Sequence, residues 1–477
     1  MSTMSNFTSI TACTTRGALV CVLALSGCAQ PKPVTSTPPA TPTSPTGITV
    51  PTGSTTTPSP TTTTTWTPDA DWRAPVGWTW TGAPGEQLGI GITVGDVDGD
   101  GLADVLASFD SPTAQGGWWI PGLAPAGPVA DAGGGVWSLD DIPYVSHGFA
   151  GGLSVGTGFT TPGEPAVAAG TIDYGQSDDP AVLVYELPGE GEIDLDASTA
   201  FLPLERLYAA DVLTGTTFVG DLDGDGSDEL LTSGTIYFGP RAGPLQAGPG
   251  DLVFTGTPSR IGSIVVGDFD LDGVNDVGGW IVGPYPTPSV LGAFMNLEPG
   301  SRDAAAPDLV WTDLGAGDVL GFPFHRALDV AGDGRAYLSM QDAAGNAQLL
   351  EPAPFADVGA WATFAPRYPD EYSAGVFGDF DGDGQQDWLV SIGAGASPAR
   401  VALLLGPIAR GAYTEDDAHS VTLLVDGPPD DLNLGGPMDV GDLDGDGRDD
   451  VVIGRSTNIT GGTDPGAVLV FPGAEFL

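Results

Sequence analysis

An acidic segment that recurs five times with the same internal spacing constrains the fold of this chain more than any other feature. Each copy has Asp at positions one, three and five, Gly at position six, and Asp or Glu at position nine. We call these copies loops 1 to 5; they span residues 96–104, 221–229, 268–276, 379–387 and 442–450. An apolar residue and a glycine precede each loop, and a short apolar run follows it. This pattern predicts two β-strands joined by an acidic turn in each copy.

The intervals between the loops indicate two further copies that have lost most of the acidic pattern. Successive loops start 125, 47, 111 and 63 residues apart, so two intervals are about twice as long as the others. One altered copy runs from Asp329 to Tyr337, where positions three and nine carry no carboxylate. The other follows Val155-Gly156, where a turn without the acidic pattern leads into the apolar run at 165–169. The sequence therefore predicts seven repeats.

Two other series of apolar segments agree with this count. Seven apolar runs end in a proline-containing turn, at 118–121, 182–188, 236–240, 294–299, 349–352, 402–407 and 468–472. A strand-like segment follows each of the first six runs, at 136–139, 199–202, 252–255, 309–312, 361–364 and 421–425. The seventh run has none before Leu477, whereas a matching segment, 77–82, precedes the first repeat.

These three series predict an all-β fold, a seven-bladed β-propeller of four-stranded blades over residues 71–477. In a closed ring the N-terminal strand would complete the last blade and leave no sheet edge open. An open solenoid is the alternative, but it would need caps and would gain nothing from the N-terminal strand.

The acidic positions indicate a cation with hard oxygen ligands. Three or four carboxylates in one tight turn would repel one another strongly without a cation. Oxygen ligands in a small flexible turn suit Ca²⁺ far better than a transition metal. An EF-hand shares the first half of the motif, but it requires Glu at position twelve, and none of the five loops has Glu there. The competing interpretation is a set of Asp-Gly hairpin turns without metal.

With these residues in view, the repeats resemble the FG-GAP (VCBS-type) repeats of integrin α-chain heads and of bacterial relatives, over nearly all of residues 71–477. The resemblance implies Ca²⁺ in loops between the first two strands of certain blades, here about five ions. It implies carboxylate ligands at positions one, three, five and nine, namely Asp96, Asp98, Asp100, Asp104, Asp221, Asp223, Asp225, Glu229, Asp268, Asp270, Asp272, Asp276, Asp379, Asp381, Asp383, Asp387, Asp442, Asp444, Asp446 and Asp450. Position seven would add a backbone carbonyl, from Leu102, Ser227, Val274, Gln385 and Arg448.

Two features depart from the family pattern. The copies near residues 157 and 329 lack the acidic set, so we expect no Ca²⁺ to bind there in this way. No segment matches the domain through which integrins pair with a β-chain, and we expect a monomer.

The charge of the chain narrows the range of partners. The chain has 62 acidic and 14 basic residues, which gives a formal net charge of −48. Such acidity argues against nucleic acid, whose phosphates would be repelled, and against electrostatic binding to anionic lipid. Hydrophobic residues make up 41% of the chain, which argues against global disorder. Bound cations would neutralise part of the acidic charge.

The first 70 residues are interpreted as an export signal and a tether. Residues 1–27 contain Arg16 followed by a short apolar stretch, typical of a secretory signal. The stretch ends in Leu25-Ser-Gly-Cys28, which resembles the lipobox of bacterial lipoproteins and implies a lipidated Cys28; a plain signal peptide is the alternative. Residues 28–70 are dominated by Pro, Thr, Ser and Gly, and this composition predicts a disordered linker. The three cysteines, Cys13, Cys21 and Cys28, all lie in this region.

The sequence favours a binding protein over an enzyme. The segment from Gly152 to Gly156 matches the nucleophile-elbow pattern around Ser154, but no amphipathic helix surrounds it. The histidines, His147, His325 and His419, show no metal-ligand spacing. We expect an exported, non-catalytic, Ca²⁺-binding lipoprotein of the bacterial envelope, held at the outer membrane by its lipid alone, that binds a protein or glycan in adhesion. The alternatives are an envelope polysaccharide hydrolase or lyase, and a structural or assembly lipoprotein.

Overall fold

The structure is a computed structural model that describes residues 77–110, 115–138, 153–170, 182–186, 191–193, 200–202, 216–232, 234–241, 243–245, 247–255, 260–282, 290–311, 327–342, 344–352, 360–367, 372–394, 397–423, 438–455 and 465–477. These residues all belong to one compact unit, Asp69–Leu477. The other unit, Met1–Pro68, contains the predicted signal, Cys28 and nearly all of the predicted linker, and these predictions lie outside the described residues. No helix in the described part of the chain is long and apolar enough to cross a membrane.

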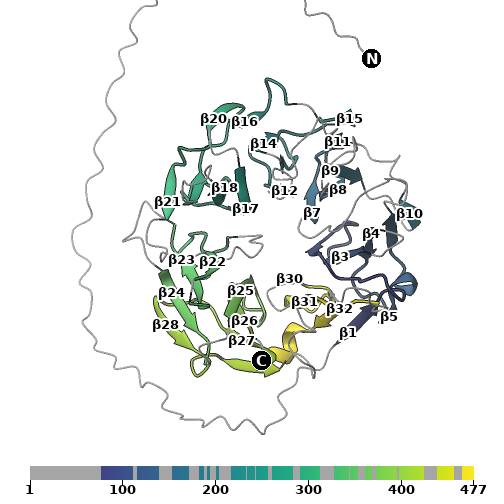
Figure 1. Ribbon diagram of the computed structural model, residues 1–477, viewed down its shortest axis with the longest axis vertical. Coiled ribbons are helices and arrows are strands. Elements are labelled where there is room, and N and C mark those ends of the chain that lie inside the picture. Colours follow the sequence, from purple (N-terminus) through teal and green to yellow (C-terminus); the bar gives the residue numbers. More distant parts are fainter. Residues whose placement is uncertain are drawn as a thin grey trace, which may run out of the picture. The chain divides into compact units, whose positions relative to one another are not determined.

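The strands of this unit form seven sheets around a common centre (Figure 1). In hydrogen-bonded order the sheets are β2(Ile92–Gly95), β3(Asp104–Asp110), β4(Gln115–Ile120), β6(Gly135–Ser138) and β10(Gly191–Ile193); β7(Leu153–Thr157), β8(Pro165–Gly170), β9(Val182–Glu186), β11(Ala200–Leu202) and β15(Gly243–Pro244); β12(Thr216–Phe218), β13(Leu230–Thr232), β14(Thr235–Tyr237), β16(Leu252–Thr255) and β20(Gly300–Asp303); β17(Arg260–Gly267), β18(Asp276–Val282), β19(Val290–Phe294) and β21(Leu309–Trp311); β22(Leu338–Gln341), β23(Ala347–Leu350), β24(Ala360–Ala365) and β28(Gly411–Thr414); β25(Tyr372–Gly378), β26(Asp387–Ala394), β27(Ser397–Leu404) and β29(Ser420–Leu423); and β30(Met438–Gly441), β31(Asp450–Arg455), β32(Ala467–Phe471), β1(Trp78–Thr81) and β5(Gly127–Pro128). Two short 3-10 helices, η1(Val129–Asp131) and η5(Gly473–Phe476), complete the described elements.

The predicted pairs of strands around the acidic loops are confirmed. Each loop joins an antiparallel pair: β2 and β3, β12 and β13, β17 and β18, β25 and β26, and β30 and β31. The copy near residue 157 joins β7 and β8 in the same way. The copy at 329–337 keeps only an isolated bridge between Leu328 and Tyr337. The predicted all-β propeller is therefore the observed architecture.

The N-terminal strand completes the sheet of the last repeat, as predicted. Strand β1 pairs antiparallel with β32, so that Trp78 lies opposite Val470 and Thr81 lies opposite Ala467. This pairing joins the two ends of the unit by backbone hydrogen bonds, which an open solenoid would not do.

Five sheets contain a short parallel strand that the prediction of four-stranded blades did not include. Strand β5 pairs with β1, β10 with β6, β15 with β11, β20 with β16, and β28 with β24. Each added strand comes from the connection between the third and fourth strands of the next repeat along the chain. The rim of the propeller is thus hydrogen-bonded from one repeat to the next.

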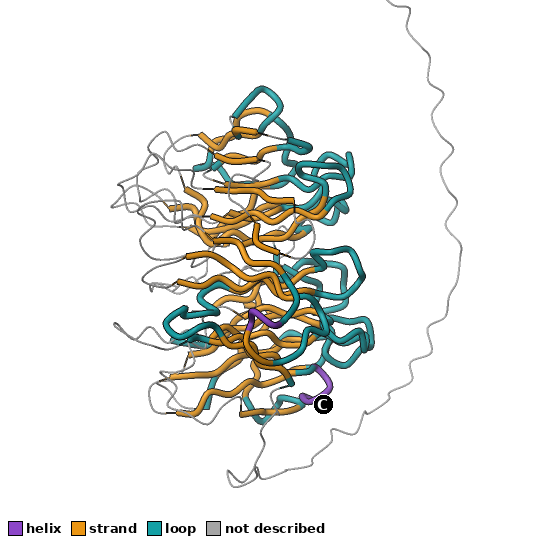
Figure 2. The backbone as a smooth tube through the Cα atoms, turned by 90° about the vertical axis from the view of Figure 1, so that its right-hand side faces the viewer, coloured by secondary structure: helices purple, strands orange, loops and turns teal. Residues whose placement is uncertain are grey.

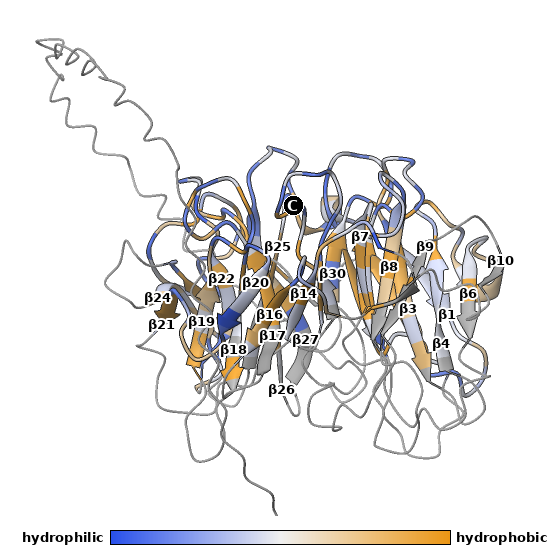
Figure 3. Ribbon diagram, turned by 90° about the horizontal axis from the view of Figure 1, so that it is seen from above, coloured by the Kyte–Doolittle hydropathy of each residue, from blue (hydrophilic) through white to orange (hydrophobic). Residues whose placement is uncertain are grey.

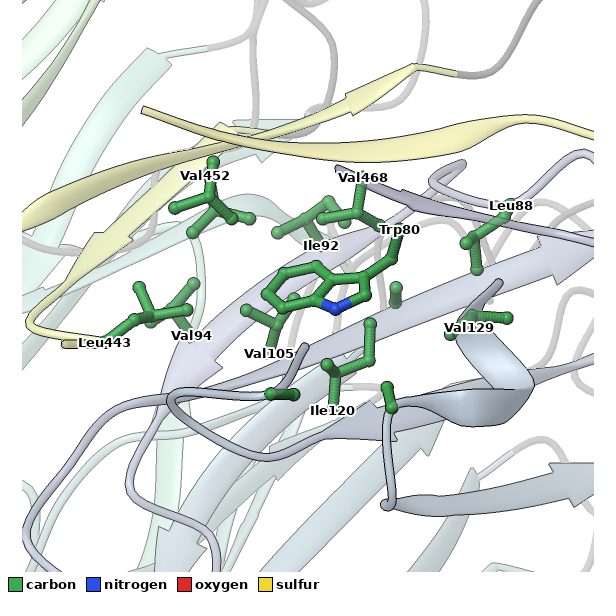
Figure 4. Packing of buried hydrophobic residues seen from close by; sticks show 14 of the residues in the cluster. Trp80, Leu88, Ile92, Val94, Val105, Ile120, Val129, Leu443, Val452 and Val468 are labelled. Atoms are coloured by element: carbon green, nitrogen blue, oxygen red, sulfur yellow. The ribbon is translucent and has the colours of Figure 1, made fainter. Parts of the chain in front are cut away.

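The hydrophobic core lies between neighbouring sheets. One cluster, which we call the closure cluster, surrounds Trp80 where the first and last repeats meet. Trp80 of β1 is 1% exposed and packs among side chains of the first and last repeats, including Val105, Ile120 and Val468 (Figure 4). Its indole Nε1 donates a hydrogen bond to the Pro125 carbonyl at 3.0 Å. Burial of this indole stabilises the closed arrangement, because the same side chain contacts both repeats that meet there.

Most of the described loops lie on one side of the strands (Figure 2), and these loops are more hydrophilic than the strands they join (Figure 3). The turns between first and second strands lie at one end of every sheet, because each repeat has the same strand order. Loops 1 to 5 therefore share one face of the propeller.

Candidate metal centres

The five loops have the same backbone conformation, held by their own carboxylates. In loop 1 the Asp96 carboxylate accepts hydrogen bonds from Gly99 N at 2.7 Å and from Gly101 N at 3.1 Å. The equivalent bonds from positions four and six to position one occur in the other four loops. Position three likewise accepts from position five, and position five accepts from position seven, in all five. The Asp residues therefore shape the turn before any ligand is considered.

The glycines of the motif are required by the turn. In loop 5, Gly445 and Gly447 have φ of 75° and 83°, in the left-handed region that residues with a Cβ rarely adopt. Loop 3 departs from this rule, because Leu271 occupies position four with φ of 66°. We did not identify this strained leucine from the sequence, although its place in a Gly position was the available signal.

The acidic residue at position nine is buried at the start of the second strand or just before it. Asp104, Asp276, Asp387 and Asp450 are each 1% exposed, and Glu229 is 0% exposed. Each accepts a hydrogen bond from the backbone N–H of position two. In loops 1, 4 and 5 its second oxygen accepts from a glycine N–H of the turn that follows the third strand, from Gly122, Gly406 and Gly473. Position nine thus ties the acidic loop to the proline-containing turn of its own repeat.

The structure gathers most, but not all, of the predicted carboxylate ligands. In loops 1, 3, 4 and 5, oxygens from positions one, three and nine lie within 4.8 Å of one another. In loop 2 all four predicted carboxylates, Asp221, Asp223, Asp225 and Glu229, meet this distance. The position-five residues of the other loops, Asp100, Asp272, Asp383 and Asp446, do not belong to these groups. The position-seven residues donate their N–H to position five, and the assignment of their carbonyls as ligands stays a prediction.

Burial makes the charge at position nine costly. Desolvation raises the pKa of Glu229 to about 8, with the neighbouring Asp carboxylates adding to the rise. The same cause raises the pKa of Asp276 and Asp450 to about 7 and that of Asp387 to about 6, and it raises the pKa of Asp104 above its ordinary value. A bound cation would remove this cost, since it favours the ionised form.

Loop 2 contains two orphaned polar atoms, and one of them, a carboxylate oxygen of the acidic cluster, fits a cation. Glu229 Oε1 and Ser227 Oγ are buried and have no hydrogen-bond partner among the described residues. A buried oxygen without a partner is costly unless a ligand satisfies it. The donor set consists of carboxylate oxygens within a compact turn, which is the set that Ca²⁺ prefers.

The altered copy at 329–337 has Tyr337 at position nine, where the other loops have a carboxylate, and Arg335 at position seven. Asp329 still accepts from Asp333 N and Gly334 N, so the turn is kept. Arg335 lies near the Asp333 carboxylate at 3.6 Å and donates to Glu351 at 2.6 Å. Tyr337, at position nine, donates its hydroxyl to Asp333 at 3.1 Å. A guanidinium and a phenol thus stabilise this turn.

The segment that matches the nucleophile-elbow pattern does not form a strand-to-helix turn. Ser154 lies inside β7, and its hydroxyl accepts a hydrogen bond from Phe218 N at 3.0 Å. Ser154 therefore links two neighbouring repeats instead of heading a strand-to-helix turn. His419 is exposed on the propeller rim segment before β29, whereas His147 and His325 lie outside the described residues.

A cavity of about 480 Å³ lies along the first strands of several repeats and is lined by polar groups. Asp439 accepts from Val94 N at 2.9 Å, and Asn275 donates to the Val219 carbonyl at 3.3 Å. Asp228 accepts from Thr157 N at 2.7 Å. These groups connect neighbouring repeats around the cavity.

Comparison with known families supports the repeat assignment. Residues 438–471, which run from β30 through loop 5 to β32, match the family model described as the FG-GAP repeat. No curated protein matches the chain. The chain therefore carries an FG-GAP repeat within an all-β propeller, as the resemblance to integrin-type propellers implied.

Proposed function

We propose that this FG-GAP propeller is a non-catalytic, Ca²⁺-stabilised binding protein. The observation that carries the proposal is the set of five acidic clusters, which share one hydrogen-bonding pattern and lie at the same end of their sheets. Repetition of the same geometry distinguishes these clusters from scattered surface acids. The proposal includes about five Ca²⁺ ions, one in each of loops 1 to 5.

The proposal counts each of the seven sheets as one blade. Six of the corresponding repeats have a first strand that pairs with the second, and the repeat of Asp329 has the bridge at Leu328 in its place. Strand β1 then completes the seventh blade.

Carboxylates at three positions of each loop would bind the ion. Positions one and three approach from the turn, and position nine approaches from the buried start of the second strand. When bound, Ca²⁺ would supply positive charge that neutralises these carboxylates and joins the turn to the sheet. The exposed parts of the loops would then be held rigidly, which suits a face that recognises another molecule.

Export and anchoring complete the proposal. The Leu25-Ser-Gly-Cys28 segment supports lipidation of Cys28, and the Pro- and Thr-rich segment after it supports a tether between anchor and propeller. The ligand class we propose is a protein or glycan of the envelope, with a role in adhesion. Metabolic labelling with a fatty acid should mark the wild-type chain and not Cys28→Ser; equal labelling would contradict the anchor.

Calcium titration by calorimetry tests the central claim. We expect about five ions per chain for a Cys28→Ser protein and fewer for Asp98→Ala or Asp444→Ala. Excess chelator should lower the melting temperature and expose the loops to protease. No heat of binding together with unchanged melting in chelator would refute the proposal.

A further inference from the structure

Loop 2 differs from the other four loops in the number of carboxylates that converge. Asp225 of loop 2 lies within 4.8 Å of the other three carboxylates, whereas the position-five Asp of the other loops lies outside its group. Asp225 makes the same bond to the N–H of position seven as its counterparts do, at 2.8 Å from Ser227 N. This hydrogen bond therefore does not explain why Asp225 joins its carboxylate group while the other position-five residues do not. The residue that differs among the acidic positions is Glu229, whose side chain is one methylene longer than Asp.

Glu229 also has an oxygen that accepts no hydrogen bond from the described residues. The residue is 0% exposed, and its second oxygen, Oε2, accepts the hydrogen bond from Leu222 N. Oε1 is buried and has no partner among the described residues. Ser227 at position seven is 1% exposed, and its hydroxyl oxygen is likewise without a partner in the described structure. The Ser227 hydroxyl lies beside Gly158 of the neighbouring repeat, so Glu229 Oε1 is the buried oxygen whose cost an ion among the four carboxylates would remove.

In loops 1, 4 and 5 the position-nine carboxylate is already engaged on both oxygens. Asp450, for example, accepts from Leu443 N at 3.1 Å and from Gly473 N at 3.0 Å. Asp104 and Asp387 make the equivalent pairs of bonds. An ion in these loops must share oxygens that backbone donors already use. An ion in loop 2 would find a fourth carboxylate and an oxygen without a donor.

We propose that loop 2 is the tightest of the five Ca²⁺ sites and fills first, with Glu229 as the residue that sets its affinity. The proposal rests on the calcium binding proposed above and ranks the sites. Charge count and rigidity of the ligand set are the properties that tune calcium affinity in protein loops. Loop 2 has four converging carboxylates where the other loops have three, and one oxygen of its position-nine side chain has no partner among the described residues.

Loop 2 contacts the neighbouring repeat, so calcium binding there should change the protection of a second, nearby segment. The backbone of Asp228, at position eight, bonds to Thr157 of the neighbouring repeat, with Asp228 N donating to the Thr157 carbonyl at 2.7 Å. The Asp228 carboxylate accepts from Thr157 N, also at 2.7 Å. That neighbour has no acidic loop of its own, so the ion in loop 2 would order the turn at 157–164 as well.

Hydrogen exchange measured by mass spectrometry during a calcium titration tests the ranking on the intact chain. Peptides that cover 216–232 and 153–170 should become protected at a free calcium concentration at least about tenfold lower than peptides covering loops 1, 4 and 5. Glu229→Gln should move the midpoint for 216–232 upward by at least about tenfold, since it removes one of the four carboxylate ligands. Asp450→Asn is the matched control: it removes the same charge at position nine of loop 5 and should leave the loop 2 midpoint unchanged. Glu229→Asp should show an intermediate shift.

The outcomes separate this inference from the proposed function. Protection of all loops at one concentration, or of loop 2 after the others, overturns the ranking and leaves calcium binding in place. A midpoint for loop 2 that Glu229→Gln and Glu229→Asp both leave unchanged also overturns it. If no loop gains protection at any calcium concentration, both the ranking and the calcium-binding function are refuted.

Discussion

Replacing Glu229 by Gln should stabilise the calcium-free protein at neutral pH. Burial raises the pKa of Glu229 to about 8 in the folded chain, against 4.5 for an exposed glutamate. Between these two values the folded state holds a proton that the unfolded state releases. The free energy of unfolding therefore falls as pH rises from 4.5 through 8, because the unfolded state binds fewer protons. At pH 7 the difference of about 2.5 pH units from the unfolded pKa corresponds to about 3 kcal/mol.

The Gln variant lacks this penalty and keeps an oxygen that can accept the hydrogen bond from Leu222 N. In chelator, its advantage over wild type in unfolding free energy should therefore grow by about 3 kcal/mol between pH 4.5 and pH 7. Comparing the two proteins at each pH cancels the contributions of the other carboxylates. Calcium should reverse the order once its free concentration reaches about one thousand times the dissociation constant of loop 2, because binding at that one site then stabilises wild type by about 4.1 kcal/mol.

Urea unfolding followed by tryptophan fluorescence, in chelator at a series of pH values, provides the measurement. Parallel pH profiles for wild type and Glu229→Gln would refute the reasoning, because they would show that Glu229 does not titrate differently in the two states. Asp450→Asn offers an independent check, since burial raises the pKa of Asp450 to about 7 and predicts a slope of the same sign.

Three further predictions concern residues that lie outside the ligand set. Leu271→Gly should raise the free energy of unfolding by about 0.5–1 kcal/mol in urea titrations, because the leucine has φ of 66° and is 44% exposed; no gain would show that its side chain contributes more than the strain costs. Asp449→Ala should weaken calcium binding in loop 4 about twofold to tenfold, because its carboxylate accepts from Asp379 N at 2.8 Å; unchanged protection of 372–394 at all calcium concentrations would contradict this coupling. Trp80→Ala should cost about 3–5 kcal/mol of stability in chemical unfolding, and a cost near zero would contradict the role of the closure cluster.

Several features of this protein could be predicted from its sequence because they depend on local physical rules. Glycine at positions four and six permits the left-handed turn, and the carboxylates at positions one, three and five accept hydrogen bonds from N–H groups only two to five residues away. The apolar runs on either side of each loop form the expected strand pairs. The segment at 77–82 forms the closing strand, because a repeat pattern that lacks one strand at its end and has one spare at its start can be completed within a single sheet.

Other features were decided only by the tertiary structure. The rim strands, such as β5, are as short as two residues, so they show no alternation of apolar and polar residues in the sequence. They form only because the edge of the preceding sheet offers a pairing partner. The sequence also predicts a carboxylate ligand at position five in every loop. The position-five oxygen joins those of positions one, three and nine only in loop 2. In loops 1 and 5 the second oxygen of position nine is bonded to a glycine of a later turn, whereas Glu229 Oε1 in loop 2 has no partner among the described residues. Residues at equal positions in the motif therefore have different hydrogen-bond partners, because those partners lie in turns outside the motif and only the folded chain brings them together.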